Sequence, residues 1–196
     1  AEIRSGVSPV TELSDADVQH MLEAGFEVLD AEDAFPDADV IVFAVPTPLS
    51  DSRGPDIASL RSAVLGAAKF AGGQQLWVVE STIHPGALEN ELLPEVEARG
   101  KTHGMDFLLA HSPERVNPGD TKHRVKDIPK IVAGHTPEAL EAALRLYDKA
   151  GFTAVAAQSI SEAASAKLLE NTYRAVNLAL VQQLAPKLAA MGVNPV

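Results

Sequence analysis

The chain has 196 residues, of which 46% are hydrophobic and 22% are charged. This balance predicts a globular protein with apolar material for one domain or slightly more, and it excludes a disordered or fibrous chain. The net charge of −11, with only 16 Lys and Arg residues, argues against a non-specific nucleic-acid binder but leaves room for an anionic small ligand.

Three absences narrow the class of protein further. No apolar run reaches the roughly 18 residues of a membrane span, and the opening AEIRSGVSPV lacks the features of a signal peptide. We therefore expect a cytoplasmic protein that makes no membrane contact. The chain contains no cysteine, which excludes a disulfide, a thiolate metal site and a thiol nucleophile within it.

Local signals predict the first elements of the chain. Ser14 is a suitable cap for a helix that runs to about Glu23, and Gly25 ends that helix. A weaker apolar stretch from Phe26 to Leu29 is predicted as a strand.

Short apolar runs predict the buried strands of a sheet. They are 40–45 (VIVFAV), 76–79 (LWVV), 107–110 (FLLA), 130–133 (KIVA) and 152–156 (FTAVA). Amphipathic helical stretches alternate with them, which is typical of a mostly parallel sheet covered on both faces. The predicted fold class is therefore α/β.

Two helices are predicted in the second half of the chain. Thr136 is a cap, followed by a proline and an acid in the first turn, and Gly151 ends this helix. From Ser161 a glycine-free stretch rich in Ala and Leu predicts one helix of roughly 25 to 30 residues, long enough to bridge two domains or to form a subunit contact. Pro186 is expected to kink or end this helix nearby.

Polar and proline-rich segments follow three of the predicted strands. They are 45–48 (VPTP), 80–86 (ESTIHPG) and 111–119 (HSPERVNPG). Ligands of open parallel sheets bind outside the carboxyl ends of the strands, so three such segments at one edge favour a site there. The alternative for any one segment is an ordinary turn or helix cap.

The long helix adds a Lys167 and Asn171 pair. Four residues apart, they lie one turn from each other on the same helix face and can together donate hydrogen bonds to an oxygen that gains negative charge. The alternative is a solvated helix surface.

These motifs together resemble the UDP-glucose/GDP-mannose dehydrogenase superfamily. The matching segments are SGVSPVTELSD at the start, VPTP, ESTxxPG, SPERVNPG, and KLLEN, TYRAVN and ALV in the long helix. SPERVNPG is similar to the form found in UDP-N-acetylmannosamine and UDP-N-acetylglucosamine dehydrogenases. The UDP-glucose and GDP-mannose enzymes usually have Phe and Glu where this chain has Arg115 and Pro118.

The resemblance implies NAD-dependent oxidation of the C6 hydroxyl of a UDP-N-acetylhexosamine to the uronate, for cell-surface polysaccharide synthesis. Two hydrides pass in succession to two NAD+ molecules, and a cysteine thiolate captures the intermediate aldehyde so that water can later cleave a thioester. UDP-glucose or GDP-mannose as substrate, and a non-catalytic Rossmann-like scaffold, are the alternatives.

The resemblance also implies roles for individual residues. Glu114 would be the general acid/base, and Thr82 would hold the water or the sugar hydroxyl. Lys167 and Asn171 would stabilise the oxyanion and, with Glu114, contact the substrate. Arg115 would reach the substrate or form an ordinary salt bridge. The residues expected at the cofactor are Val45, Pro46, Thr47, Ser81 and Thr82.

Two parts of such an enzyme do not occur in the chain. There is no GxGxxG to place the NAD pyrophosphate on a helix N-terminus, and there is no cysteine nucleophile. We expect residues 1–158 to be the later part of an NAD-binding Rossmann domain and residues 159–196 to be a central helix that forms a homodimer. The fragment alone is expected to be inactive.

Histidines and one basic cluster offer further candidates. His84 and His111 lie next to the expected site, but the six histidines lack paired spacing, so we expect no metal. The segment Lys122–Lys126 could meet a phosphate, and a solvated loop is the alternative.

Overall fold

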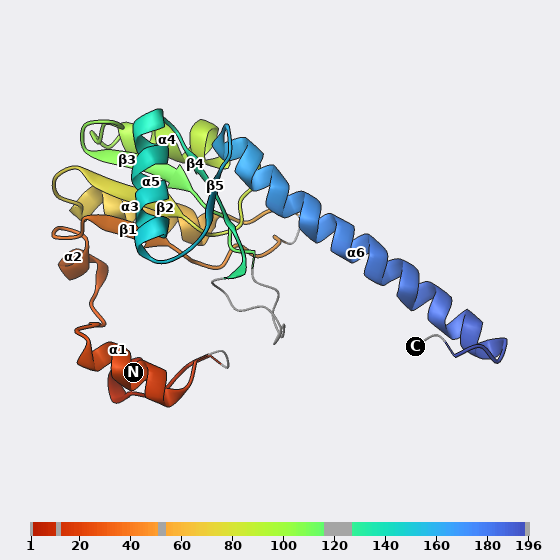
Figure 1. Ribbon diagram of the computed structural model, residues 1–196. Coiled ribbons are helices and arrows are strands. Elements are labelled where there is room, and N and C mark those ends of the chain that lie inside the picture. The colour runs from red at the N-terminus through yellow and green to blue at the C-terminus, as the bar shows by residue number, and fades with distance from the viewer. Residues whose placement is uncertain (1, 11–12, 51–53, 116–126, 195–196) are drawn as a thin grey trace.

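A computed structural model describes residues 2–10, 13–50, 54–115 and 127–194. A central β-sheet has helices on both faces, and one long helix projects away from this body (Figure 1). The predicted α/β class is confirmed. None of the helices in these ranges combines the length and apolarity needed to cross a bilayer.

The sheet has five strands in sequential order. They are β1 (Val40–Phe43), β2 (Gln75–Val79), β3 (Phe107–His111), β4 (Lys130–Gly134) and β5 (Ala154–Ala156). Parallel pairing joins β1 to β2, β2 to β3, and β4 to β5, whereas β3 and β4 pair antiparallel. The carboxyl ends of β1, β2 and β3 therefore lie side by side at one edge.

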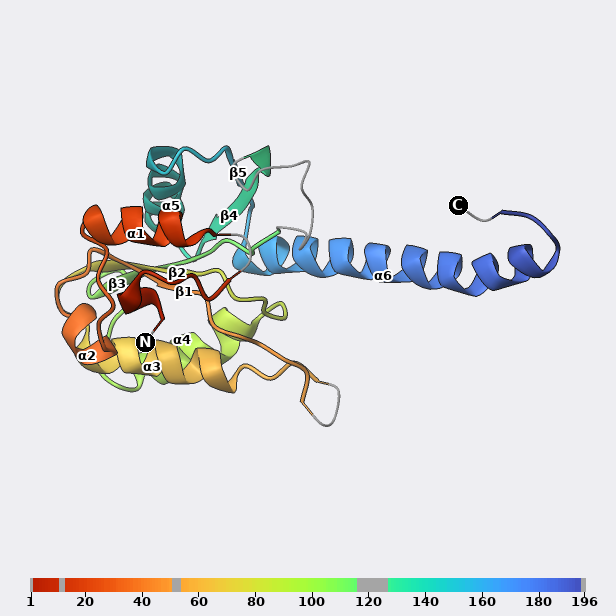
Figure 2. The ribbon, with the colours of Figure 1, turned by 90° about the horizontal axis from the view of Figure 1, so that it is seen from below.

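Eight helical segments occur in the described ranges. They are η1 (Ile3–Ser5), α1 (Asp15–Glu23), α2 (Ala31–Ala34), α3 (Ala58–Phe70), the π-helix η2 (Ala87–Leu92), α4 (Leu93–Glu97), α5 (Pro137–Lys149) and α6 (Ile160–Ala190). Helices α3 and α4 cover one face of the sheet, and α5 covers the other (Figure 2). The predicted covering on both faces is confirmed.

The larger core lies between the sheet and α3, η2 and α4. Trp77 is its centre, because the Trp77 and Phe107 rings stack with centroids 4.2 Å apart and Phe43 meets Trp77 edge-on. Ile160 at the start of α6 is buried in the same cluster. The root of the long helix is thus fixed to the sheet.

The predicted caps are confirmed in detail. The Ser14 hydroxyl accepts a hydrogen bond from the Asp17 N–H while the Asp17 carboxylate accepts one from the Ser14 N–H, which is a capping box. The Thr136 hydroxyl accepts a hydrogen bond from the Ala139 N–H at the start of α5. Gly25 and Gly151 follow their helices with φ of 95° and 81°, where a side chain would be strained.

Some predicted boundaries differ from the structure. The strand expected at Phe26–Leu29 was wrong: no strand pairs with this segment in the described residues, and Phe26 and Leu29 are exposed. Strand β1 ends at Phe43 rather than Val45, because the Val45 N–H donates to the Ser81 hydroxyl. Helix α6 continues through Pro186 and ends one turn later, which agrees with the expected end nearby.

Candidate active site

The carboxyl ends of the first strands line an open cleft, here called the strand-end cleft. Its lining residues are Ala44, Val45, Pro46, Thr47, Glu80, Ser81, Thr82 and Glu114. Three segments far apart in the sequence therefore meet at one place, as their positions after the strands predicted. Thr82 and Glu114, and the five residues expected at the cofactor, all lie in this lining.

Ser81 ties the first two strand ends together. Its hydroxyl accepts a 2.9 Å hydrogen bond from the Val45 N–H and donates a 2.8 Å hydrogen bond to the Val45 carbonyl. The Glu80 and Ser81 N–H groups both donate to the Phe43 carbonyl. Ser81 is only 6% exposed, so its hydroxyl holds the 45–48 segment in place.

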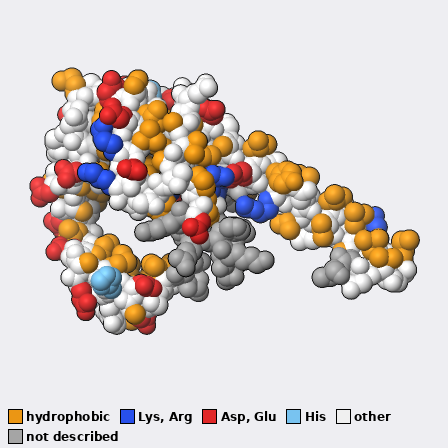
Figure 3. All heavy atoms as spheres, in the orientation of Figure 1, with side chains coloured by type: hydrophobic (Ala, Val, Ile, Leu, Met, Phe, Trp, Pro, Cys, Tyr) orange, Lys and Arg blue, Asp and Glu red, His pale blue; other side chains and the backbone are white. Residues whose placement is uncertain are grey.

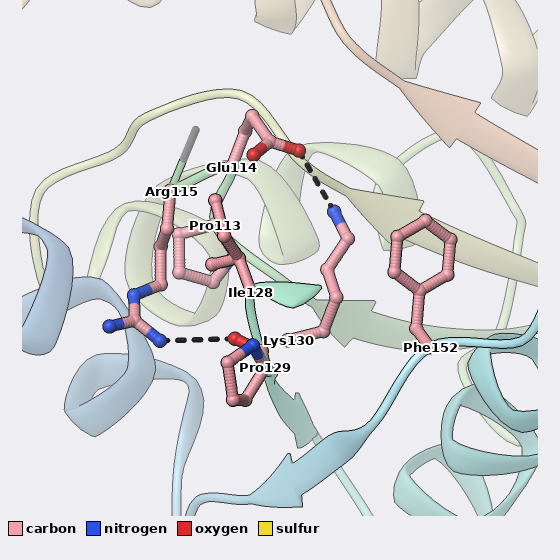
Figure 4. A pocket seen from close by; sticks show the side chains of 7 residues that line it. All are labelled: Pro113, Glu114, Arg115, Ile128, Pro129, Lys130 and Phe152. Atoms are coloured by element: carbon pink, nitrogen blue, oxygen red, sulfur yellow. Dashed lines mark hydrogen bonds and ion pairs between the residues drawn. The ribbon is translucent and has the colours of Figure 1, made fainter. Parts of the chain in front are cut away.

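A buried lysine links two carboxylates beside the cleft. Lys130 Nζ lies 2.9 Å from Glu80 Oε1 and 3.2 Å from Glu114 Oε2, and its side chain is 7% exposed. Figure 4 shows the Lys130 side chain extending between Glu114 and Phe152, with its ammonium directed at the Glu114 carboxylate.

Tyr147 on α5 completes this network. Its hydroxyl donates a 2.5 Å hydrogen bond to Glu80 Oε1. Burial is the main cause that raises the pKa of Tyr147 well above its ordinary value, and the hydrogen bond to Glu80 is the second cause. The phenol therefore stays protonated and acts as a donor.

Arg115 is paired within the protein. Its Nε donates a 2.9 Å hydrogen bond to Glu170 Oε2, Nη2 pairs with the other oxygen of that carboxylate, and Nη1 donates to the Pro129 carbonyl at 3.0 Å. The bond to Pro129 is visible in Figure 4. This two-point pair favours the salt bridge over direct contact with a substrate.

The predicted pair on α6 lies outside the lining of the strand-end cleft. Lys167 is half-buried, and this burial lowers the pKa of its ammonium, an effect that the negative charge of Glu114 partly opposes. Asn171 Oδ1 lies 3.5 Å from Nη1 of Arg174, one turn further along α6. Lys167 is thus close enough to Glu114 for their charges to interact, whereas the side-chain contact of Asn171 is with Arg174.

The two histidines near the site have structural partners. His84 Nε2 lies 3.0 Å from Glu91 Oε1 on η2. His111 is completely buried, with Nδ1 2.7 Å from the Val79 carbonyl, and burial lowers its pKa to about 4. Within the described ranges, no three His, Cys, Asp or Glu residues gather as metal ligands would. The basic segment Lys122–Lys126 and Asn117–Gly119 lie outside the described residues.

Comparison with known proteins identifies the family of the chain. Residues 1–151 match the NAD binding domain of the UDP-glucose/GDP-mannose dehydrogenase family. The chain belongs to this family. It is 36% identical over 197 residues to UDP-N-acetyl-D-glucosamine 6-dehydrogenase of Pseudomonas aeruginosa. The aligned region covers 99% of the chain and 46% of that protein.

Further members of the family are similar in sequence and in fold. Protein CapL of Staphylococcus aureus is 42% identical over 150 residues, which are 76% of the chain and 35% of CapL. The solved UDP-D-ManNAc dehydrogenase of Pyrococcus horikoshii superposes with a TM-score of 0.83 at 30% identity, over 99% of the chain and 47% of that structure. The chain thus spans about half the length of such relatives.

The family motifs led to Glu114 but not to the residues that hold it. The sequence placed Lys130 in a strand, Glu80 after a strand and Tyr147 in a helix, and it predicted no role in the site for any of them. The available signal was a lysine opening an otherwise apolar strand, KIVA, because a charge in a buried strand requires a partner.

Proposed function

We propose that the chain is the NAD-binding part of an enzyme that oxidises the C6 hydroxyl of a UDP-N-acetylhexosamine to the uronate, for cell-surface polysaccharide synthesis. The observation that carries this proposal is the meeting of Thr82 and Glu114 with the 45–48 segment in one cleft. Family membership and the match to relatives named for UDP-N-acetylhexosamines support it.

The residues proposed to contact the cofactor form one wall of the strand-end cleft. Ser81 occupies both backbone polar groups of Val45, so the following Pro46 and Thr47 present a fixed wall to the strand-end cleft. Bound NAD+ would supply the hydride acceptor. In this proposal Val45, Pro46, Thr47, Ser81 and Thr82 line its nicotinamide side.

Glu114 and Thr82 have the geometry for proton handling. Both face the strand-end cleft, and the Glu114 side chain is 46% exposed, so water and substrate can reach it. A carboxylate at this place can take a proton from the sugar hydroxyl or from water and return it, while the Thr82 hydroxyl orients the same oxygen.

Lys167 and Asn171 are proposed to stabilise the oxyanion and contact the substrate. The lowered pKa of Lys167 reflects partial desolvation of a cation beside Glu114, where a positive charge has most effect on a developing negative one. The chain has no cysteine, so a thiol step requires a residue outside these 196.

Helix α6 is proposed as a homodimer contact, with residues 159–196 as a central element separate from residues 1–158. Apolar side chains are exposed along α6 beyond its root (Figure 3). They include Leu168, Leu169, Tyr173, Val176, Leu178, Leu180, Val181, Leu184 and Leu188. They surround the helix, which is typical of a helix buried on several sides. A second copy is the proposed partner, and the cytoplasm the proposed location.

A substrate panel tests the function. The full-length protein containing these residues is mixed with NAD+ and, separately, with UDP-GlcNAc, UDP-ManNAc, UDP-glucose and GDP-mannose. We expect two NADH per sugar oxidised with a UDP-N-acetylhexosamine. Activity confined to UDP-glucose or GDP-mannose would favour the alternative substrates, and no NADH binding or formation would favour a non-catalytic scaffold.

A further inference from the structure

Lys130 is a buried cation that must always have a counter-charge. Its side chain is 7% exposed, and the rings of Tyr147 and Phe152 lie 5.1 and 5.8 Å from its nitrogen. Removing one partner of a buried ion pair leaves an uncompensated charge in the protein interior, which strongly destabilises the fold. If one of the two carboxylates beside Lys130, Glu80 or Glu114, always remains as the counter-charge, the other is free to gain and lose a proton.

The two carboxylates beside Lys130 are not equivalent. The Glu80 side chain is 19% exposed, and its Oε1 lies 2.9 Å from Lys130 Nζ. This oxygen also accepts a hydrogen bond from the Tyr147 hydroxyl. The Glu114 side chain is 46% exposed, its Oε2 lies 3.2 Å from Lys130 Nζ, and it faces the strand-end cleft. Glu80 thus makes the closer and more buried contact with Lys130, whereas Glu114 is open to a ligand in the strand-end cleft.

We propose that Glu80 is the permanent counter-ion of Lys130, and that Lys130 is a positioning residue that holds Glu114 ready to gain and lose a proton. With Glu114 ionised, the ammonium binds both carboxylates. When Glu114 takes a proton, Glu80 still neutralises Lys130, so neither state of Glu114 leaves a buried charge without a partner.

This inference rests on the proposed acid/base role of Glu114 and deepens it. The step is one proton transfer, in which an O–H bond of water or the sugar hydroxyl breaks and the proton moves to a carboxylate oxygen of Glu114. Among the residues that the structure describes, the charged and titratable groups that face Glu114 include Lys130 from β4, Glu80 from the end of β2, Lys167 from α6 and Tyr147 from α5. Arg115 is occupied by Glu170.

The titration of Glu114 in this 196-residue chain gives a test that needs no activity. The ¹³C signal of its carboxyl carbon is followed against pH and assigned by its loss in Glu114→Gln. Lys130→Met removes the cation and should move the titration midpoint up by about one pH unit or more. Glu80→Gln leaves Glu114 as the sole counter-ion of Lys130 and should move the midpoint down by a similar amount.

Three further variants control this experiment. Lys130→Arg keeps the charge and should stay near the wild-type midpoint. Lys69→Met removes a lysine that also contacts an aromatic ring, Phe70 at 4.5 Å, but lies on α3 away from the cleft, so the midpoint should not move. Tyr147→Phe loosens Glu80 and should lower the midpoint by less than Glu80→Gln does.

Opposite shifts for Lys130→Met and Glu80→Gln support the inference. Unchanged midpoints, or shifts in the same direction, would overturn it. Should Lys130→Met fail to fold, Glu80→Gln and Lys130→Arg decide the question. In the full-length protein, the acid limb of the pH–rate profile should follow the same order. If Glu114→Gln keeps full activity, the proposed function fails, whereas the NMR result on the charge network stands.

Discussion

Arg115 and Glu170 join the segment after β3 to the long helix through a two-point ion pair. Nε and Nη2 of the guanidinium each contact one oxygen of the carboxylate, and Nη1 holds the carbonyl of Pro129. This pair fixes the first turns of α6 next to Glu114. The position of Lys167, one turn before Glu170, therefore depends on it.

A double-mutant cycle on this pair measures the coupling. The side chains are 23% and 37% exposed, so we expect Arg115→Ala and Glu170→Ala each to destabilise the chain, with a coupling energy of about 1 kcal/mol. Urea unfolding of wild type, both single variants and the double variant gives this energy. Additive effects would mean that the pair contributes nothing to the attachment of α6.

Ser81→Ala should loosen the side of the strand-end cleft that we propose for the cofactor. The change leaves the Val45 N–H and carbonyl without their hydroxyl partner, so we expect a loss of about 1–2 kcal/mol in the free energy of unfolding. Ser62→Ala on the exposed side of α3 is the matched control and should have little effect. In the full-length protein, NADH affinity should fall for Ser81→Ala alone; equal affinity in both variants would count against a fixed 45–48 wall.

His111 should make the fold sensitive to mild acid. Burial lowers its pKa from 6.5 to about 4, so between these values the unfolded chain binds a proton that the folded chain does not. Stability from this residue is therefore complete above 6.5 and is lost as the pH falls toward 4. His111→Asn keeps a donor for the Val79 carbonyl without a titrating ring. Urea unfolding across this interval should show a shallower pH slope for the variant, and parallel slopes would contradict the prediction.

The strands and caps could be predicted because their signals are local. The runs VIVF and LWVV are apolar without interruption, and Ser14 and Thr136 precede acidic first turns, so neighbouring residues suffice to specify the elements. The stretch Phe26–Leu29 carries a weaker form of this signal and has no adjacent strand in the described residues, and a strand requires a partner for its backbone groups.

The charge network of the site could not be predicted in this way. The antiparallel pairing of β3 with β4 depends on the path between them, and it brings Lys130 to the carboxyl end of β2. Glu80, Lys130 and Tyr147 come from three separate elements, so their contacts exist only in the folded chain. The family motifs indicated Glu114 but carried no information on what surrounds it.

The central claim is that Glu114 is the acid/base of a nucleotide-sugar dehydrogenase, and Glu114→Gln in the full-length protein tests it most directly. The steady-state rate of NADH formation from NAD+ and a UDP-N-acetylhexosamine should fall by about 10²–10⁴-fold, with NADH affinity unchanged. Glu141→Gln, which removes an exposed carboxylate of α5, is the control and should keep the wild-type rate. A Glu114→Gln protein that forms NADH at the wild-type rate would contradict the account.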